Sequence, residues 1–396
     1  MSAPALREVA RAFATDEVAP HASTWDREQH LPREIITRMG ALGLLGAPLP
    51  AALGGGGADH VALAGLYEEL GRACASVRGF LTVHAGLVSQ CLADHADPEQ
   101  QQRWLPKLAR GEWIGCYALT EAEAGSDVAA IATTAERAGD DWVLNGEKVW
   151  ITNGGVADLA LVFARTEPDA GRKGLTAFVV QPPTDGWHAL PLGVEPLGHR
   201  ASNHVRLELR DVRVPDRDRV GAVGAGFAIA MAGLDHGRLG VAAGAVGLGK
   251  ACLDEALAHA RARHQFGRRI GDFQMVQADL ADMSVELEAA ALVDRAARAA
   301  DAGDPATTRL TSSAKLFATE AAQRAATKAV LLLGNRGYGD GHPVERHYRD
   351  IQGLRIYEGT NHIQRVIIAR ALLGKPEPGA GSGAEPGAGS VGGPKA

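Results

Sequence analysis

The feature that most restricts the fold is a strict alternation of apolar and charged side chains in HVRLELRDVRVP, residues 204–215. Apolar residues occupy positions 205, 207 and 209, and charged residues occupy positions 206, 208 and 210. This period of two predicts a strand of an antiparallel sheet that has one face in water. The runs LALVFAR and LTAFVVQP predict further strands, and Asn145-Gly146 in WVLNGEKVWIT predicts a hairpin turn. A β-domain is therefore expected at residues 113–225.

Helical patterns flank this β-domain on both sides. The segments LREVARAFATDEV, LPREIITRMGALGLLG and VALAGLYEELGRACASV carry apolar residues at spacings of three and four, which predicts a helical domain at residues 1–112. Residues 226–374 are again helical in pattern and rich in small residues, which suits closely packed helices. The glycine-rich GLGKAC lies inside this region, so it indicates close packing and not a nucleotide loop. The predicted fold class is α+β: an N-terminal all-α domain, a middle β-domain, a C-terminal helical bundle, and a disordered Gly/Pro/Ala-rich tail at residues 375–396.

Composition and charge exclude several classes of protein. The net charge of -6 offers no basic surface for nucleic acid. The cysteines form no CxxC pair and no histidine cluster accompanies them, so neither a metal site nor a disulfide framework is expected. The N-terminus lacks the apolar core of a signal peptide, and no apolar run of about 18 residues occurs. We therefore expect a cytoplasmic protein that does not enter a membrane.

Two stretches of the β-domain combine groups that could hold a flat cofactor ring. CYALTEAEAGSD, residues 116–127, gathers Thr120, Ser126 and several backbone N–H groups in one loop, although a plain domain-crossing loop explains it equally well. In VWITNGG, residues 149–155, Trp150 and Thr152 project from one face of a strand, where an indole and a hydroxyl can stack on a ring and bond its edge. Taken by itself, this second stretch is better explained by a tryptophan in a β-core. No G-x-G-x-x-G motif follows a strand and no P-loop is present, so a Rossmann unit is not expected.

Several motifs, in one order and spacing, resemble the acyl-CoA dehydrogenase family. They are GCYALTEAEAGSD, VLNGEKVWITNGG, LGHRAS with LRDVRVP, RARHQFGRRIGDFQ, VERHYRD and IYEGTNHIQR, and the resemblance covers residues 5–374. It implies that the C-terminal bundle has four helices and that FAD lies between the β-domain and this bundle. It also implies an oxidoreductase acting on the CH–CH group of an acyl thioester, a homotetramer, and an electron-transfer flavoprotein as electron acceptor.

The same resemblance assigns residues to the flavin. A neighbouring subunit is implied to hold the adenosine and pyrophosphate through Arg263, Phe266 and Gln274, and the fork of an arginine suits a pyrophosphate. One departure puts FAD affinity or the subunit contact in doubt: the family often has Gln-x-x-Gly-Gly where this chain has LLLGN at residues 331–335. Within one subunit the flavin is implied to be lined by Tyr117, Leu119, Thr120, Ser126, Trp150, Thr152 and Thr360.

The catalytic base is implied to be Glu358 in RIYEGTNHIQR, residues 355–365. In the family a base removes the α-proton while a hydride leaves the β-carbon for flavin N5, and a carboxylate in a water-poor site gains the basicity for this step. Backbone N–H of the base and a ribityl hydroxyl polarise the thioester carbonyl, and the small Gly359 leaves room for it. Some members place the base on a bundle helix, where this chain has Gly237, which cannot act as a base.

Other residues of the site follow from the same comparison of motifs. A helix-start carboxylate stabilised by the helix dipole is the alternative explanation of Glu358. For Arg238, which resembles an arginine that supports the site, a helix arginine paired to a carboxylate is an equally good explanation. Contacts with the substrate are implied for Ser126, Arg238, Tyr357 and Gly359.

Arg78 in ASVRGFLTVH bears on the identity of the acyl group. This segment belongs to the domain that helps to close the acyl pocket in the family, and a buried guanidinium is costly without a partner. An arginine there suits a short acyl group that ends in a carboxylate or hydroxyls. Glutaryl-specific members resemble this chain in that respect, and so do relatives that make hydroxymalonyl extender units for polyketides on a carrier protein. Solvent exposure explains Arg78 equally well, and both coenzyme A and an acyl carrier protein remain open as the carrier.

Two other functions compete with the dehydrogenase. A flavin monooxygenase of the same fold would activate oxygen, but such proteins generally lack the glutamate of the YEGT motif. A non-catalytic scaffold would carry no flavin at all.

Overall fold

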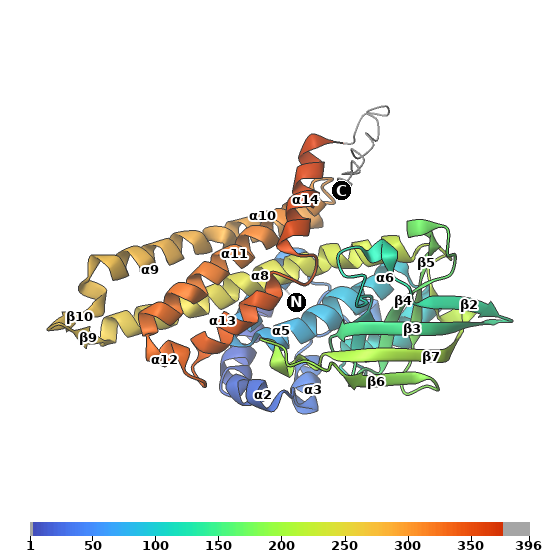
Figure 1. Ribbon diagram of the computed structural model, residues 1–396, viewed down its shortest axis with the longest axis horizontal. Helices are drawn as coiled ribbons and strands as arrows, with labels where there is room; N and C mark the ends of the chain where they lie inside the picture. The colour runs from blue at the N-terminus through green and yellow to red at the C-terminus, as the bar shows by residue number, and fades with distance from the viewer. Residues whose placement is uncertain (1–2, 375–396) are drawn as a thin grey trace, which may run out of the picture.

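The computed structural model describes residues 3–374, and the tail predicted to be disordered, 375–396, lies outside the described residues. The chain forms helices first, then a sheet, then helices again. Figure 1 shows the sheet at one end of the molecule and the C-terminal helices along its length. The predicted α+β class, with a helical domain, a β-domain and a helical bundle, is confirmed.

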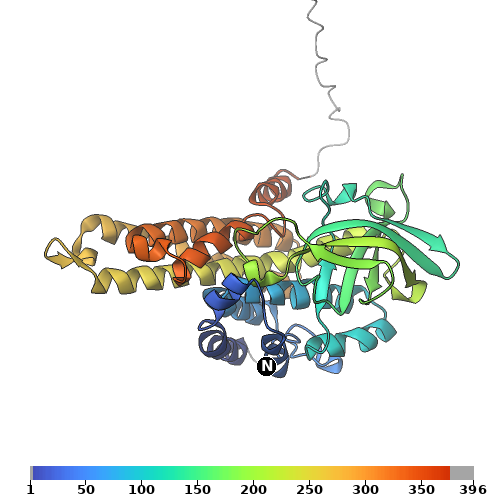
Figure 2. The same cartoon turned by 60° about the horizontal axis from the view of Figure 1, so that its bottom comes forward.

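The N-terminal helices pack against the bundle, as Figure 2 shows from below. One continuous apolar core joins the two parts, because Leu70 and Val246 belong to the same buried cluster. Side chains that cap helix ends define two of the starts: Asp59 accepts a hydrogen bond from Ala62 N, and Asp97 forms a capping box with Gln100. The helices are α1 (Ala3–Phe13), α2 (Ala22–Glu28), α3 (Arg33–Ala41), α4 (His60–Ala73), α5 (Ala75–Leu81), α6 (Gln90–His95) and α7 (Pro98–Ala109), and Thr82–Ser89 continues α5 with π-helical bonding.

The β-domain contains an eight-stranded sheet. In β7 the predicted alternation is confirmed, because positions 205, 207 and 209 are buried while 206, 208 and 210 are half-buried or exposed. The strands run in the order β6-β7-β3-β2-β4-β5-β8, and β1 pairs with β4 in parallel. Their bounds are β1 (Gly115–Ala118), β2 (Thr134–Ala138), β3 (Asp141–Ile151), β4 (Leu159–Arg165), β5 (Leu175–Val180), β6 (Trp187–Pro191), β7 (Val205–Pro215) and β8 (Arg219–Val220).

The predicted hairpin at Asn145-Gly146 is wrong, because β3 continues through both residues. The turn lies earlier, at Gly139 and the residue after it, between β2 and β3. Gly146 instead forms an irregularity in the pairing of β3 with β7, with a φ of 150°. A Cβ on this glycine would lie 2.5 Å from Thr133 Oγ1, so the position needs glycine for close packing. The Asn-Gly pair therefore marks a bulge and not a turn.

The C-terminal helices pack closely through small residues. A Cβ on Gly71 would lie 2.7 Å from Gly244 Cα, and a Cβ on Gly247 would lie 2.9 Å from the Glu68 carbonyl carbon. This confirms that GLGKAC lies within a helix and serves packing. The elements are α8 (Gly226–Ala262), β9 (His264–Gln265), β10 (Arg268–Arg269), α9 (Gln274–Glu286), α10 (Ala290–Asp301), α11 (Thr307–Leu333), α12 (Asn335–Tyr338), α13 (Pro343–Leu354) and α14 (Asn361–Leu373).

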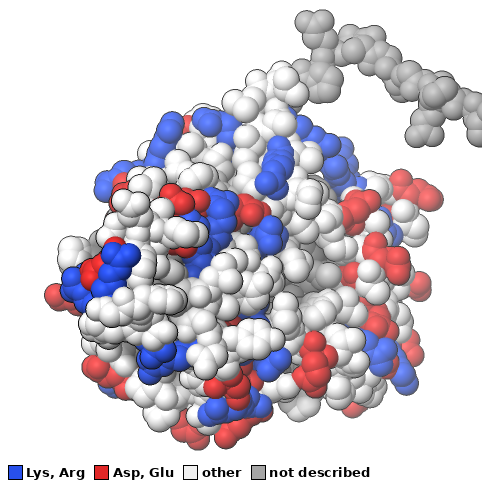
Figure 3. Space-filling model, turned by 60° about the vertical axis from the view of Figure 1, so that its left-hand side comes forward, with Lys and Arg blue, Asp and Glu red and all other residues white. Residues whose placement is uncertain are grey.

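The surface carries both signs of charge. On the face in Figure 3, acidic and basic side chains are interspersed, as the net charge of -6 would suggest. None of the helices in residues 3–374 has the length together with the apolar content that a bilayer span requires.

Candidate active site

Glu358 lies in the loop that joins α13 to α14, and its backbone is unusual. Its φ is 56° and that of Gly359 is 83°, so two successive residues are left-handed. This conformation costs free energy for a residue that has a Cβ. Thr360 then caps α14, since its hydroxyl accepts a hydrogen bond from Ile363 N at 3.2 Å. The sharp bend turns the Glu358 side chain inward, away from the start of the helix.

Glu358 is half-buried, and one oxygen of its carboxylate has neither solvent contact nor a hydrogen-bond partner within residues 3–374. Its Oε2 is inaccessible to solvent and unbonded among the residues that the structure describes. Burial raises the pKa of Glu358 from 4.5 to about 7, although the positive charges of Arg238, Arg78 and Lys315 act to lower it. A carboxylate of this kind can accept a proton near neutral pH.

Gly237 makes room for this carboxylate on α8. A Cβ at position 237 would lie 2.5 Å from Glu358 Cδ and 2.7 Å from Oε1. Ordinary contacts of a Cβ begin near 3.4 Å, so any larger residue here would collide with the carboxylate. Positions 237 and 358, the two places where members of the family carry the base, are therefore direct neighbours in space.

Arg238 satisfies both explanations that the sequence left open. It is 4% exposed and pairs with Asp235 one turn earlier on α8. Its charge also opposes the burial effect on the pKa of Glu358 more strongly than any other charge does. The guanidinium Nε has no hydrogen-bond partner in the described chain. Arg238 is thus a paired arginine that also borders the carboxylate.

Arg78 is buried, and the suggestion that it points into solvent is wrong. The side chain is 1% exposed. Its Nη2 donates to the Tyr357 hydroxyl, and its Nη1 donates to Thr82 Oγ1 at 3.2 Å. The Tyr357 hydroxyl in turn lies 3.3 Å from His199 Nε2. Arg78 therefore touches the residue that directly precedes Glu358 in the chain.

Trp150 lies in β3 and Thr152 lies just beyond the end of this strand at Ile151, so the two do not share one face of a strand as predicted, although they lie close together. Both contact His204: the Trp150 ring meets its imidazole edge at 5.9 Å, and Thr152 Oγ1 lies 3.1 Å from Nδ1. The reason is not simple alternation, because the pairing with β7 shifts between Lys148 and Ile151 and Trp150 has a φ of 58°. The indole is 49% exposed, so the explanation by a tryptophan buried in a β-core is wrong.

Hydrogen bonds and an ion pair hold the loop after β1 against β3. Lys148 has no exposed surface, and its Nζ donates to Glu121 Oε1 at 2.7 Å and to the Leu119 carbonyl at 3.1 Å. Val149 N donates to the Thr120 carbonyl at 2.9 Å. These bonds bring the stretch 119–121 beside Trp150 and leave Ser126 exposed. The sequence did not single out Lys148 or its partner Glu121.

Tyr117 faces a different way from the rest of the loop. Its ring packs on Phe163 with centroids 5.0 Å apart, and its hydroxyl donates to the Ala230 carbonyl at 3.2 Å. The Tyr117 side chain is thus buried between the sheet and the start of α8.

Arg263, Phe266 and Gln274 lie away from these residues. They surround the short β9-β10 ribbon, which Figure 1 shows at the opposite end of the molecule from the sheet. All three are exposed, and Phe266 is 93% exposed. One chain therefore does not bring them to Glu358. No group of metal-ligating side chains occurs within residues 3–374.

The three-part fold places the Glu358 carboxylate against α8 of the helical bundle. Family models match almost the whole chain. Those described as acyl-CoA dehydrogenase N-terminal, middle and C-terminal domain match residues 2–112, 116–212 and 224–373. The chain belongs to the acyl-CoA dehydrogenase family. It is an oxidoreductase, and FAD is the cofactor of this family.

Three relatives show the range of the similarity. The mitochondrial short-chain specific acyl-CoA dehydrogenase of Rattus norvegicus is 42% identical over 371 residues, which cover 93% of this chain and 89% of the relative. A glutaryl-CoA dehydrogenase from Mycobacterium smegmatis, solved in complex with FADH2, is 32% identical with a TM-score of 0.89 and covers 94% and 95% of the two chains. The prolyl acyl carrier protein oxidase AnaB is also 32% identical with a TM-score of 0.89 and covers 93% and 98%.

Proposed function

We propose that this chain oxidises a short acyl thioester, with Glu358 as the base that removes the α-proton. The observation that carries this proposal is the Glu358 carboxylate. Its Oε2 is inaccessible and has no partner in the described chain, and burial raises the pKa of the carboxylate to about 7. FAD, when bound, supplies the acceptor for the hydride that leaves the β-carbon. The chain contributes the base, the orientation of the thioester and the exclusion of water.

The residues of this chain fit FAD. Trp150 is a half-exposed aromatic ring near the C-terminal end of β3, and exposure of such a ring to water brings little stability. Beside it, Thr152 and the braced stretch 119–121 offer polar groups for a ring edge. We assign Tyr117, Leu119, Thr120, Ser126, Trp150, Thr152 and Thr360 to the flavin within one subunit.

The backbone around Glu358 fits the thioester carbonyl. Among residues 3–374, no acceptor is bonded to the N–H of Glu358. This donor and the carboxylate belong to one residue, so a thioester could meet both at once. The bond would strengthen as negative charge develops on the carbonyl oxygen, which is what lowers the barrier to proton removal. Gly359 has no side chain that would obstruct a thioester as it approaches the Glu358 N–H.

We further propose that the acyl group is short and ends in a carboxylate or hydroxyl. Arg78 is buried, and its hydrogen-bond partners within residues 3–374 are two hydroxyls, of Tyr357 and Thr82. Its Nε has no partner there. A buried guanidinium that lacks a carboxylate partner is costly, and an anionic substrate would supply the missing charge. The likeness to a glutaryl-CoA dehydrogenase supports this class of substrate.

A carrier-bound hydroxyacyl group, such as a hydroxymalonyl extender unit, is a second candidate. The likeness to an acyl carrier protein oxidase supports a protein carrier. The hydroxyls of Thr82 and Tyr357 beside Arg78 suit an oxygen-bearing acyl group. Electron-transfer flavoprotein is the proposed acceptor, and a neighbouring subunit would reach the cofactor through Arg263, Phe266 and Gln274 in a tetramer.

Anaerobic titration of the bound flavin tests the substrate proposal. Butyryl, octanoyl, glutaryl and hydroxyacyl thioesters would be compared on coenzyme A and on a carrier protein. Arg78→Ala should lower kcat/KM for a carboxylated or hydroxylated substrate by roughly 30-fold, about 2 kcal/mol, and leave butyryl turnover nearly unchanged. Arg72→Ala, which removes an arginine paired with Asp254 at the surface, is the matched control. Equal loss on both substrates, or a parent enzyme that prefers octanoyl, would remove Arg78 from the argument.

The same titration separates the dehydrogenase from a flavin monooxygenase of this fold. Bleaching of the flavin by the acyl thioester without oxygen supports the dehydrogenase. Substrate-dependent oxygen uptake with no anaerobic bleaching would support the monooxygenase.

A further inference from the structure

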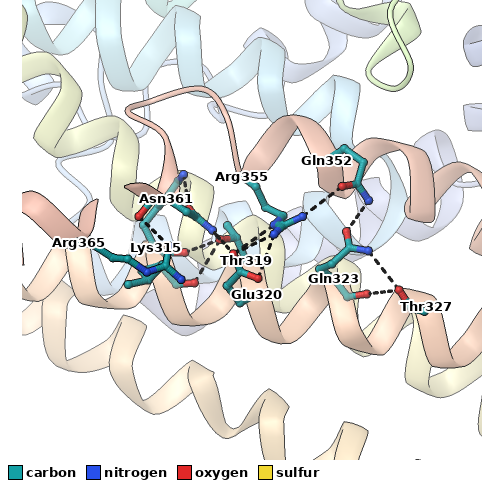
Figure 4. Close-up of polar contacts among 10 residues, drawn as sticks. Lys315, Thr319, Glu320, Gln323, Thr327, Gln352, Arg355, Asn361 and Arg365 are labelled. Carbon is teal, nitrogen blue, oxygen red and sulfur yellow. Dashed lines mark hydrogen bonds and ion pairs between the residues drawn. The ribbon is translucent and has the colours of Figure 1, made fainter. Parts of the chain in front are cut away.

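Lys315 on α11 is a buried lysine beside the Glu358 loop. Its side chain has no exposed surface. Its Nζ donates to the Gly359 carbonyl at 3.0 Å and to Asn361 Oδ1 at 2.8 Å, and Figure 4 shows Lys315 pointing at Asn361. No carboxylate in the described chain forms an ion pair with it. A buried ammonium with only neutral acceptors is costly, which points to a role other than stability.

The same stretch of α11 also holds both flanks of the loop. Arg355, before the loop, pairs with Glu320 at 3.1 Å. Asn361, after the loop, donates to Glu320 Oε1 at 2.8 Å. Figure 4 shows these side chains converging on α11 from the ends of α13 and α14. The two ends of the loop are therefore fixed to one rigid helix.

A second group holds the loop backbone from the other side. Gln364 Nε2 donates to the Glu358 carbonyl at 3.1 Å and to the Gly359 carbonyl at 2.8 Å. The Gly359 carbonyl thus accepts from Lys315 and Gln364 together. This clamp acts on the two left-handed residues, whose conformation persists only where the surroundings fix it.

We propose that Lys315 is a positioning residue for the catalytic base: it fixes the loop through the Gly359 carbonyl and presents a positive charge that favours the ionised Glu358. The inference rests on the proposed role of Glu358. A lysine that only held the loop would affect the rate without changing the protonation of Glu358.

The charges around Glu358 set the sign of this effect. Titratable and charged groups face it from several elements: Tyr67, Arg78, Cys91, Tyr117, Arg238 and Lys315. Its chain neighbour Tyr357 interacts with it as well. The three cations lower the pKa of Glu358, against burial. Burial lowers the pKa of Lys315 to about 7, while the charge of Glu358 acts to raise it. Loss of the ammonium should therefore move the pKa of Glu358 upward.

Two variants separate the clamp from the charge. Lys315→Met removes both the donor and the ammonium at similar volume. Gln364→Leu removes a neutral donor to the Gly359 carbonyl and to the Glu358 carbonyl, and it removes no charge. Lys328→Met is the matched control, because Lys328 lies on α11 but pairs with Asp279 and Asp282. Flavin content and the unfolding temperature would first show that each variant is folded.

The readout is anaerobic stopped-flow reduction of the flavin between about pH 5 and about pH 9, a range of about two units on either side of neutral pKa values. Lys315→Met should slow reduction about tenfold or more at pH 7 and move the half-maximal pH upward by at least about 0.5. Gln364→Leu should slow reduction several-fold without moving the profile, and Lys328→Met should change neither. An unshifted profile for Lys315→Met would overturn the proposal.

Two further results test the role of Lys315 if Lys315→Met does not fold or if Glu358 is not the base. If Lys315→Met does not fold, the clamp is judged from Gln364→Leu and Asn361→Ala, and rates within twofold of the parent for both would overturn it. If Glu358→Gln proves as active as the parent, the proposed function has failed. An inactive Glu358→Gln with a normal Lys315→Met would refute the role of Lys315 alone.

Discussion

Gly237→Ala should disable the base without unfolding the protein. The added Cβ would lie 2.5 Å from Glu358 Cδ, whereas ordinary contacts begin near 3.4 Å. Helix α8 is buried along residues 237–249, and the atoms that the Cβ meets are the end of the Glu358 side chain, so the carboxylate must withdraw by about 1 Å. A misplacement of about 1 Å costs on the order of 100-fold in rate, or about 2.7 kcal/mol of transition-state stabilisation.

The assay is anaerobic flavin reduction by a saturating short acyl thioester. Gly65→Ala is the control, because it adds the same methyl group inside α4 where the nearest atom lies at 3.4 Å. Both substitutions replace a helical glycine by alanine, so neither should lower the unfolding temperature through helix propensity. Glu358→Gln gives the rate without a base. A Gly237→Ala enzyme that reduces its flavin within threefold of the parent rate would show that the carboxylate does not occupy this position.

Four other outcomes are expected. Glu358→Gln should keep its flavin and lose reduction by roughly 10²–10⁴-fold in stopped flow, since an amide cannot take the proton. Burial raises the pKa of Glu358 from 4.5 to about 7, so ionisation destabilises the fold as pH rises through this window. In denaturant titrations Glu358→Gln should match the parent at pH 4 and exceed it by about 3 kcal/mol at pH 8; an equal gap at both would contradict this. Arg263→Ala should weaken flavin binding and oligomerisation together, and a monomer with normal FAD content in light scattering would refute the link. Lys148→Met should lower stability by about 3–5 kcal/mol, and adding Glu121→Gln should restore part of it in thermal unfolding.

The spacing of apolar residues predicted helices and strands well where the buried side chains recur with the period of the helix or strand. The alternation in β7 was sufficient because one face of that strand is buried and the other is not. The same logic failed at Asn145-Gly146, because glycine serves a turn and a bulge equally, and contact with Thr133 decides between them. That contact depends on a strand pairing which sequence alone does not reveal.

The candidate site was predicted from motifs and not from contacts. Glu358 and Gly237 were each singled out, but their closeness depends on how the loop after α13 meets α8. The bond between Arg78 and Tyr357 joins residues 279 positions apart, and the bond between Lys315 and Gly359 joins residues 44 apart. No local signal marks Lys148 or Lys315 as buried, because isolated lysines usually lie at the surface.

The contact between position 237 and the carboxylate also limits how such an enzyme can change during evolution. An acid at 237 would displace the Glu358 carboxylate from its present position, since even a methyl group at 237 meets it. Moving the base from the loop to the helix therefore needs two substitutions, and each single intermediate either crowds the base or lacks one. Substitutions elsewhere in the chain would not relieve this conflict between positions 237 and 358, so the base is expected to stay on the loop.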